Sequence, residues 1–219
     1  MKNKKNIQEE FTNYEKYAGG FSSQIVSLVP AGSKVLDIGC GSGALAAELL
    51  KKNCSTTGID LSSEALSYAD EYCEKTICGN IEHTSSIMDL IKPESFDVIT
   101  AGDVLEHMID PWSVVDKLKP LLRDGGLFIS SIPNSAFISQ RLKFFFGSIT
   151  YQEGGGIMDI GHLRMFSFNT AKHLFEEAGY KIVAHKGVNT VQDKYFFLRP
   201  LGAIYPRLFA IHTIIVAEK

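Results

Sequence analysis

Two histidines in this sequence of 219 residues are placed to act as general bases. His107 follows Glu106 soon after an apolar run typical of a buried strand, and His162 lies in a glycine-rich stretch without strong periodicity. An imidazole with its ordinary pKa of about 6.5 suits the removal of a proton from a phenol or a similar hydroxyl. Long irregular loops in compact domains are often functional. We take His107 as the first candidate base and His162 as the second; for His107, bracing of the strand–helix connection is the alternative.

A glycine-rich turn gives the strongest signal for ligand binding. The apolar strand at 35–38 ends in Gly39-Cys40-Gly41-Ser42-Gly43, and a helical pattern follows at 44–50. Glycines let the backbone approach a ligand closely, and a helix N-terminus offers unpaired N–H groups to an anionic group. Asp60 ends a second apolar strand about twenty residues later, where a carboxylate can accept hydrogen bonds from two ribose hydroxyls. The turn therefore predicts a nucleotide-cofactor site.

The glycine spacing alone does not decide which cofactor binds. Gly39, Gly41 and Ala44 satisfy the dinucleotide fingerprint, so a nicotinamide or flavin enzyme stays open. Asp37 and Gly43 extend the pattern to Asp-x-Gly-x-Gly-x-Gly, which resembles motif I of the class I S-adenosylmethionine (SAM)-dependent methyltransferases. A carboxylate beside the turn suits a cofactor with an ammonium and a sulfonium better than one with a pyrophosphate.

The resemblance covers most of the chain. The pair at 60–61 is similar to the ribose-binding acidic position, and 78–81 is similar to the adenine loop, with Asn80 where the family usually has Asp. Residues 96–107 resemble the fourth strand and its acidic-apolar-Glu-His segment, and 121–130 resemble the Gly-Gly turn into the fifth strand. The cofactor-binding residues that the resemblance implies are Asp37, Gly39, Cys40, Gly41, Gly43, Asp60, Leu61, Gly79, Asn80, Ile81, Gly102 and Asp103.

The resemblance implies an enzyme that transfers a methyl group from SAM to a small-molecule acceptor at oxygen, leaving S-adenosylhomocysteine (SAH). Oxygen is favoured by similarity to the small bacterial ubiquinone-biosynthesis-type methyltransferases and by the histidine bases. Residues 151–166 resemble a substrate-side segment, so Tyr151 and Arg164 are substrate-binding candidates. Arg164 could clamp a carboxylate or phosphate of the acceptor, or pair with Asp159 to fix the loop. An NAD(P)-dependent oxidoreductase and a non-catalytic SAM- or SAH-binding module are the alternatives.

We expect no metal ion. The ubiquinone-biosynthesis resemblance would allow Glu106 to bind a metal with His107, or to orient it, but a Glu–His pair supplies too few ligands. Of the four cysteines, Cys73 and Cys78 lie near His83, at a spacing that matches no common zinc pattern. Reduced thiols are the prediction for all four.

Strand and helix patterns alternate through the first two thirds of the chain. Strand runs at 34–38, 55–60, 75–79, 96–101 and 126–132 alternate with helical patterns at 42–52, 62–74, 84–91 and 111–122. The alternation predicts right-handed βαβ units and a parallel sheet covered on both faces. A helix over 168–178 and strands near 180–187 and 213–217 follow. We predict an α/β fold, a Rossmann-like three-layer sandwich with a seven-stranded, mostly parallel sheet and, as in similar enzymes, an antiparallel last strand.

The length supports one sizeable core. We expect a single methyltransferase domain over 1–219, with an N-terminal helical flank at 1–30, whose helix covers 7–29, and substrate-side insertions at 133–178 and 188–209. The aromatic runs at 144–146 and 195–198 could line an acceptor pocket, touch a membrane surface or form a dimer interface. Burial in the core is the simplest role for most of these side chains.

The formal net charge of −3 gives no global electrostatic footprint for nucleic acid. No apolar segment follows the basic first residues, and no run approaches the roughly 18 apolar residues of a spanning helix. We therefore expect a small-molecule acceptor, no nucleic-acid partner, no membrane span, a cytoplasmic location, and either a monomer or a homodimer.

Overall fold

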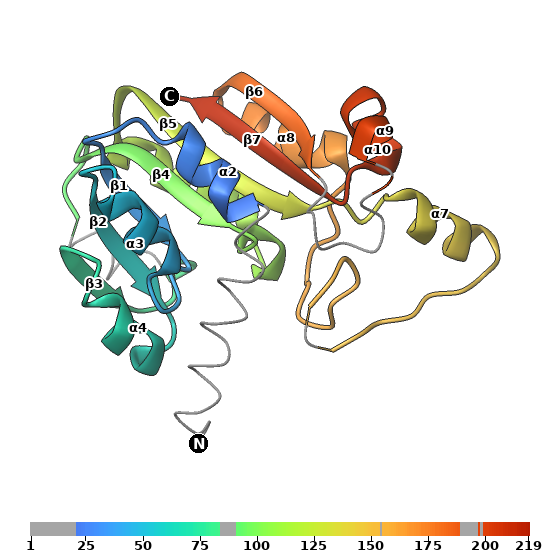
Figure 1. The fold of residues 1–219 in the computed structure, drawn as a ribbon, viewed down its shortest axis with the longest axis horizontal. Helices are drawn as coiled ribbons and strands as arrows, with labels where there is room; N and C mark the ends of the chain where they lie inside the picture. Colours follow the sequence, from blue (N-terminus) through green and yellow to red (C-terminus); the bar gives the residue numbers. More distant parts are fainter. Residues whose placement is uncertain (1–20, 84–90, 154, 189–196, 198) are drawn as a thin grey trace.

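The computed structural model describes residues 21–83, 91–153, 155–188, 197 and 199–219 (Figure 1). The strands are β1 (Lys34–Ile38), β2 (Ser55–Asp60), β3 (Lys75–Cys78), β4 (Phe96–Gly102), β5 (Leu122–Pro133), β6 (Lys181–Val188) and β7 (His212–Glu218). The helices are α2 (Phe21–Leu28), α3 (Ala44–Leu50), α4 (Ser63–Ala69), α6 (Pro111–Leu118), α7 (Ile138–Phe145), α8 (Phe168–Glu177), α9 (Arg199–Ile204) and α10 (Pro206–Phe209), with 3-10 helices η1 (Leu105–His107) and η2 (Lys119–Leu121). Residues 84–90 of the helix predicted at 84–91 and residues 7–20 of the predicted N-terminal helix fall outside the described residues.

The strands form one seven-stranded sheet in the order β3-β2-β1-β4-β5-β7-β6. The five strands from β1 to β5 pair in parallel, whereas β7 runs antiparallel to both β5 and β6. This arrangement confirms the predicted mostly parallel sheet with an antiparallel last strand. The register pairs Ile38 with Ala101, so the segments that follow β1 and β4 leave the sheet side by side.

Neighbouring strand residues supply two separate hydrophobic cores. Val35 and Val98 belong to a cluster with residues of α2 and α3, while Leu36 and Ile99 belong to a larger cluster with residues of α6 and α8. Successive side chains of a strand point to opposite faces, so each apolar run covers both faces of the sheet. Figure 1 shows α2 and α3 in front of the sheet and α8 behind it, which is the expected three-layer sandwich.

Several element boundaries differ from the predictions. The first crossover helix begins at Ala44 rather than at 42, because Gly43 takes a left-handed conformation with φ of 83°. The helix predicted over 111–122 ends at Leu118 and continues as η2, because Pro120 has no N–H group to donate. Strand β5 starts at Leu122, four residues earlier than predicted, and its pairing with β4 shifts register between Phe96 and Val98.

The chain beyond β5 leaves the sheet as α7 and a long loop before returning through α8 (Figure 1). Phe145 and Phe146 expose 82% and 78% of their surface, so core burial was the wrong expectation for this aromatic run. Phe197, in the second run, is also exposed, and the other members of that run lie outside the described residues. Among the described helices, none is both long and apolar enough to cross a membrane.

Candidate active site

The glycines of the turn after β1 serve different purposes. A Cβ at Gly39 would lie 2.5 Å from Cγ2 of Val104, and one at Gly43 would lie 2.9 Å from Cα of Ala69. These two glycines allow close packing against neighbouring segments. At Gly41, φ is 53° and no described heavy atom lies within 4 Å of the Cβ position. Gly41 therefore faces open space, which leaves room for a ligand against the backbone.

Two carboxylates flank this turn. Asp60 accepts hydrogen bonds from the backbone N–H groups of Gly41 (2.8 Å) and Ser62 (2.9 Å), which fixes its side chain beside the turn. Asp37 is almost fully buried and accepts a hydrogen bond from the Thr100 hydroxyl at 2.7 Å. Burial raises the pKa of Asp37 to about 7, since desolvation disfavours the charged form. A nearby cationic ligand would offset that cost.

The remaining predicted cofactor residues lie at the carboxyl ends of four strands, β1 to β4. Leu61 follows β2 with 69% of its surface exposed, while Cys40 of the turn is buried. Gly79 donates its N–H to the Asp60 carbonyl, and the Asn80 side-chain oxygen accepts the N–H of Glu82. Gly102 ends β4 and Asp103 follows it. Ile81 belongs to the larger core cluster, so a cofactor contact there would have to use its backbone.

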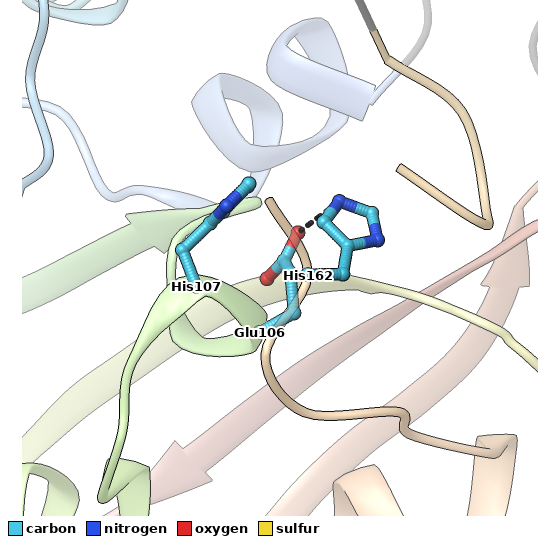
Figure 2. Close-up of side chains that lie close together, drawn as sticks. All are labelled: Glu106, His107 and His162. Atoms are coloured by element: carbon cyan, nitrogen blue, oxygen red, sulfur yellow. Dashed lines mark ion pairs between the residues drawn. The ribbon is translucent and has the colours of Figure 1, made fainter. Parts of the chain in front are cut away.

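Glu106, His107 and His162 come together at the end of β4 (Figure 2). Nε2 of His162 lies 3.9 Å from Oε1 of Glu106, and the two imidazole rings meet edge to face with centroids 4.8 Å apart. The side chains of Glu106 and His162 expose only 1% and 9% of their surface. The structure thus unites residues that are 55 positions apart in the sequence, including both predicted bases.

Backbone carbonyls define the tautomers of both imidazoles. Nδ1 of His107 lies 2.9 Å from the Gly161 carbonyl oxygen, and Nδ1 of His162 lies 3.2 Å from that of Ile157. A carbonyl oxygen can only accept, so each Nδ1 donates and each neutral ring keeps a basic lone pair on Nε2. Burial lowers the pKa of His162, which favours this neutral, basic form.

The carboxyl of Glu106 has no hydrogen-bond partner among the described residues. Burial raises its pKa well above the ordinary value, and the charge of Asp103 raises it further. A protonated carboxyl is therefore the favoured state beside neutral His162. The donor atoms of Glu106, His107 and His162 all lie within 4.8 Å of one another, a grouping that could also hold a metal ion. Acid–base chemistry is the alternative role for the same three groups.

Asp103 is held by residues that the sequence analysis did not single out. Its carboxylate accepts a hydrogen bond from the Ser131 hydroxyl at 2.7 Å and lies 3.4 Å from Nε2 of His212. Burial acts to raise the pKa of Asp103, but His212 and Ser131 outweigh it and the pKa is lowered. Asp103 also has a left-handed backbone, with φ of 53°, at the point where β4 leaves the sheet. Ser131 and His212 sit on β5 and β7, so only the sheet order reveals the grouping.

The two predicted substrate-binding residues lie on the loop that carries His162. The Arg164 guanidinium donates to the Ile109 carbonyl oxygen, and its backbone N–H donates to that of Glu106 at 2.9 Å. Asp159, the alternative partner of Arg164, accepts from the N–H groups of Gly155 and Gly161 instead. Tyr151 is 55% exposed and precedes the isolated bridge between Gln152 and Asp159.

Solved structures of SAM-dependent methyltransferases share this fold. One from Archaeoglobus fulgidus superposes with a TM-score of 0.63 over 97% of this chain and 94% of its own, at 14% identity. The 1,6-didemethyltoxoflavin-N1-methyltransferase of Burkholderia thailandensis, solved with SAH, gives a TM-score of 0.60 over 90% of this chain and 76% of its own, at 18% identity. At such identities the likeness shows the fold alone.

Comparison of the sequence with known protein families identifies the family of this chain. A model of the methyltransferase domain matches residues 14–185, and the chain belongs to this family. The ubiquinone biosynthesis O-methyltransferase of Cupriavidus pinatubonensis is 40% identical over 178 residues, 80% of this chain and 68% of that protein. The protein of the same name from Actinobacillus pleuropneumoniae is 39% identical over 108 residues, 46% of each chain. The chain thus spans about half the length of several curated relatives that it matches.

The residues around the turn fit SAM, the cofactor of this family. The open space at Gly41 accommodates a ligand against the backbone, and the Asp60 carboxylate retains acceptor capacity for ribose hydroxyls. The buried Asp37 carboxylate suits a cationic group rather than a pyrophosphate. An NAD(P)-dependent oxidoreductase and a non-catalytic SAM-binding module gain no support from these matches.

Proposed function

We propose that this chain is a SAM-dependent methyltransferase that methylates an oxygen atom of a small-molecule acceptor. The observation that carries the proposal is the position of the His162–Glu106–His107 cluster next to the glycine turn. Val104, which packs on Gly39, stands only two residues before Glu106. We therefore place the cofactor and the bases at one edge of the sheet. The names of the ubiquinone biosynthesis O-methyltransferases, among the relatives matched, support oxygen as the target.

SAM, when bound, supplies an electrophilic methyl group. We assign Asp60 to the ribose hydroxyls, the loop at Asn80 to the adenine, and the turn with Asp37 to the cationic end of the cofactor. His162 then takes the proton from the acceptor hydroxyl at Nε2, which is the nitrogen that its carbonyl partner leaves basic. His107, the first candidate from the sequence, is more exposed and is held by the Gly161 carbonyl, so we now propose it as the second base. Glu106, protonated and without a partner in the described structure, offers a hydrogen-bond donor to the acceptor.

Segments 133–178 and 188–209, as far as they are described, are proposed to form the acceptor side of a single domain. Asn134, which is fully buried, supports this arrangement. Its side chain donates to the Ala210 carbonyl at 2.8 Å and accepts from the N–H of Phe168 at 3.2 Å. One amide therefore joins three segments that are distant in the sequence. Tyr151 stays a proposed acceptor contact on the same side.

The base assignment is tested by His162→Gln in an assay of methyl transfer from labelled SAM to a panel of phenolic acceptors. We expect kcat to fall about 10²- to 10⁴-fold with the KM for SAM unchanged.

Because burial lowers the pKa of His162, wild-type kcat should stay high at neutral pH and decline only below about pH 6.5. His173→Gln, on the exposed face of α8, is the control. EDTA is included in a parallel series, since the three donor atoms lie close together. Unchanged kcat in His162→Gln would contradict the assignment.

A further inference from the structure

The turn between η1 and α6 is held by a carboxylate from the cofactor side. A single oxygen of Glu82, Oε1, accepts the backbone N–H groups of Ile109 (2.8 Å) and Asp110 (2.9 Å). Glu82 belongs to the loop after β3 in which Asn80 is the proposed adenine contact. The Asn80 side chain accepts the N–H of Glu82 at 2.9 Å, so the two residues share one hydrogen-bonded turn.

The same turn is held from the acceptor side by a guanidinium. Nε of Arg164 donates to the Ile109 carbonyl oxygen at 2.8 Å, and Nη2 donates to the same oxygen. The backbone N–H of Arg164 also donates to the Glu106 carbonyl. Arg164 is two residues from His162, so this contact anchors the loop that carries the proposed base.

Both backbone groups of Ile109 are therefore bound by charged side chains: Glu82 accepts its N–H, and Arg164 donates to its carbonyl oxygen. Hydrogen bonds to ionised groups are stronger than neutral ones, and bonds in a chain polarise one another. Each partner is on a different loop, and no helix or strand of the described residues joins the two loops. One short backbone segment at Ile109 thus contacts both loops.

Building on the proposed function, we propose that Glu82, the backbone at Ile109 and Arg164 form a strut that couples the cofactor loop to the His162 loop. Glu82 and Arg164 are then positioning residues for the reaction, and Arg164 is not an acceptor clamp. A cofactor that fixes the loop at Asn80 also restricts the opening of the His162 loop. By thermodynamic reciprocity, ordering of the His162 loop by an acceptor tightens cofactor binding.

The test uses backbone hydrogen exchange, read by mass spectrometry over the peptide 157–166, with and without saturating SAH. We expect SAH to slow exchange of this peptide about fivefold or more in the wild type. Glu82→Ala and Arg164→Ala should each lose more than half of that slowing although SAH still binds. The double variant should lose no more than the singles, because both act through one strut.

Glu82→Gln keeps an oxygen that accepts from Ile109 and should retain the slowing. Glu94→Ala, which removes an exposed carboxylate paired only loosely with Lys219, is the matched control. Retention of half or more of the slowing in either Glu82→Ala or Arg164→Ala would overturn the strut, while leaving the methyltransferase proposal intact. Failure of SAH to bind the wild type would instead contradict the proposed function and the strut together.

Discussion

The three glycines of the turn after β1 have different roles: two allow close packing in the fold, and one leaves space for a ligand. Gly39 and Gly43 avoid contacts with Val104 and Ala69, whereas Gly41 borders open space. All three have positive φ, which costs an L-residue about 1–2 kcal/mol. Of the three, only Gly41 has room in the protein itself for a side chain, so a ligand is the reason for glycine there beyond its positive φ.

Gly41→Ala should therefore separate binding from folding. We expect it to lower the free energy of unfolding by about 1–2 kcal/mol, from backbone strain alone, and to weaken SAH binding at least tenfold. Gly39→Ala should cost roughly 1–3 kcal/mol more, because its Cβ collides with Val104. Urea denaturation and calorimetric titration with SAH measure both effects. Unimpaired SAH binding by Gly41→Ala would be evidence against the proposed cofactor position.

Asp37 should make the unliganded protein less stable as the pH rises. Its folded pKa of about 7 lies above the ordinary 3.8, because of burial, so between these values the folded state holds a proton that the unfolded state has lost. Stability thus falls as pH rises through this window and levels off above pH 7. Asp37→Asn removes the titration, and its stability advantage over wild type should grow by about 2 kcal/mol between roughly pH 5.5 and 8.5.

Urea denaturation at the two pH values measures this gain, without ligand. Asp124→Asn, at a highly exposed carboxylate, should show no such trend. An Asp37→Asn advantage that stays constant or shrinks with pH would show that burial of this carboxyl carries no such cost. In either case, weaker SAM binding is expected from the variant, since the proposed partner of the cationic group is lost.

At the scale of elements, the core strands were predictable and the acceptor side was not. β1 and β2 match their predicted ranges, and in β1 the signal was the apolar run that is typical of a buried parallel strand. The cofactor turn followed from its glycines and acidic residues. Backbone hydrogen bonds, such as the one from the Arg164 N–H to the Glu106 carbonyl, connect the loop around His162 to η1. Every residue has these backbone groups, so the sequence does not show which of them will pair. The contribution of Glu82 was hidden for the same reason.

Asn134 is the side chain on which the acceptor-side elements most depend. Asn134→Ala would leave the Ala210 carbonyl and the N–H of Phe168 without their partner in the interior. We expect a loss of about 2–4 kcal/mol in the free energy of unfolding, since each buried unpaired polar group costs about 1–3 kcal/mol. Thermal unfolding would detect this, with Asn169→Ala on α8 as the control. A loss equal to that of the control would show that other contacts hold these segments together.

For the whole molecule, the sheet order brings three chemical groups to one edge. The turn after β1, the carboxylate after β2 and the acid–base cluster after β4 all follow the carboxyl ends of neighbouring parallel strands. This edge is where α/β folds of this kind bind their ligands. Helix α7, which carries exposed aromatic residues, lies on the proposed acceptor side, away from β1 and α3 (Figure 1). Cofactor binding and acceptor selection are thus assigned to different parts of the chain.

The most direct measurement is thermal unfolding of the protein with SAM, SAH, NAD or NADP, in wild type and in Asp60→Ala. A ligand at 100 times its Kd adds about 2.7 kcal/mol of stability, or roughly 5–10 °C for a chain of this size. We expect SAM and SAH to raise the midpoint by that amount, NAD and NADP to leave it unchanged, and Asp60→Ala to abolish the shift. Stabilisation by NAD or NADP alone would contradict the methyltransferase account and make the glycine turn a dinucleotide site.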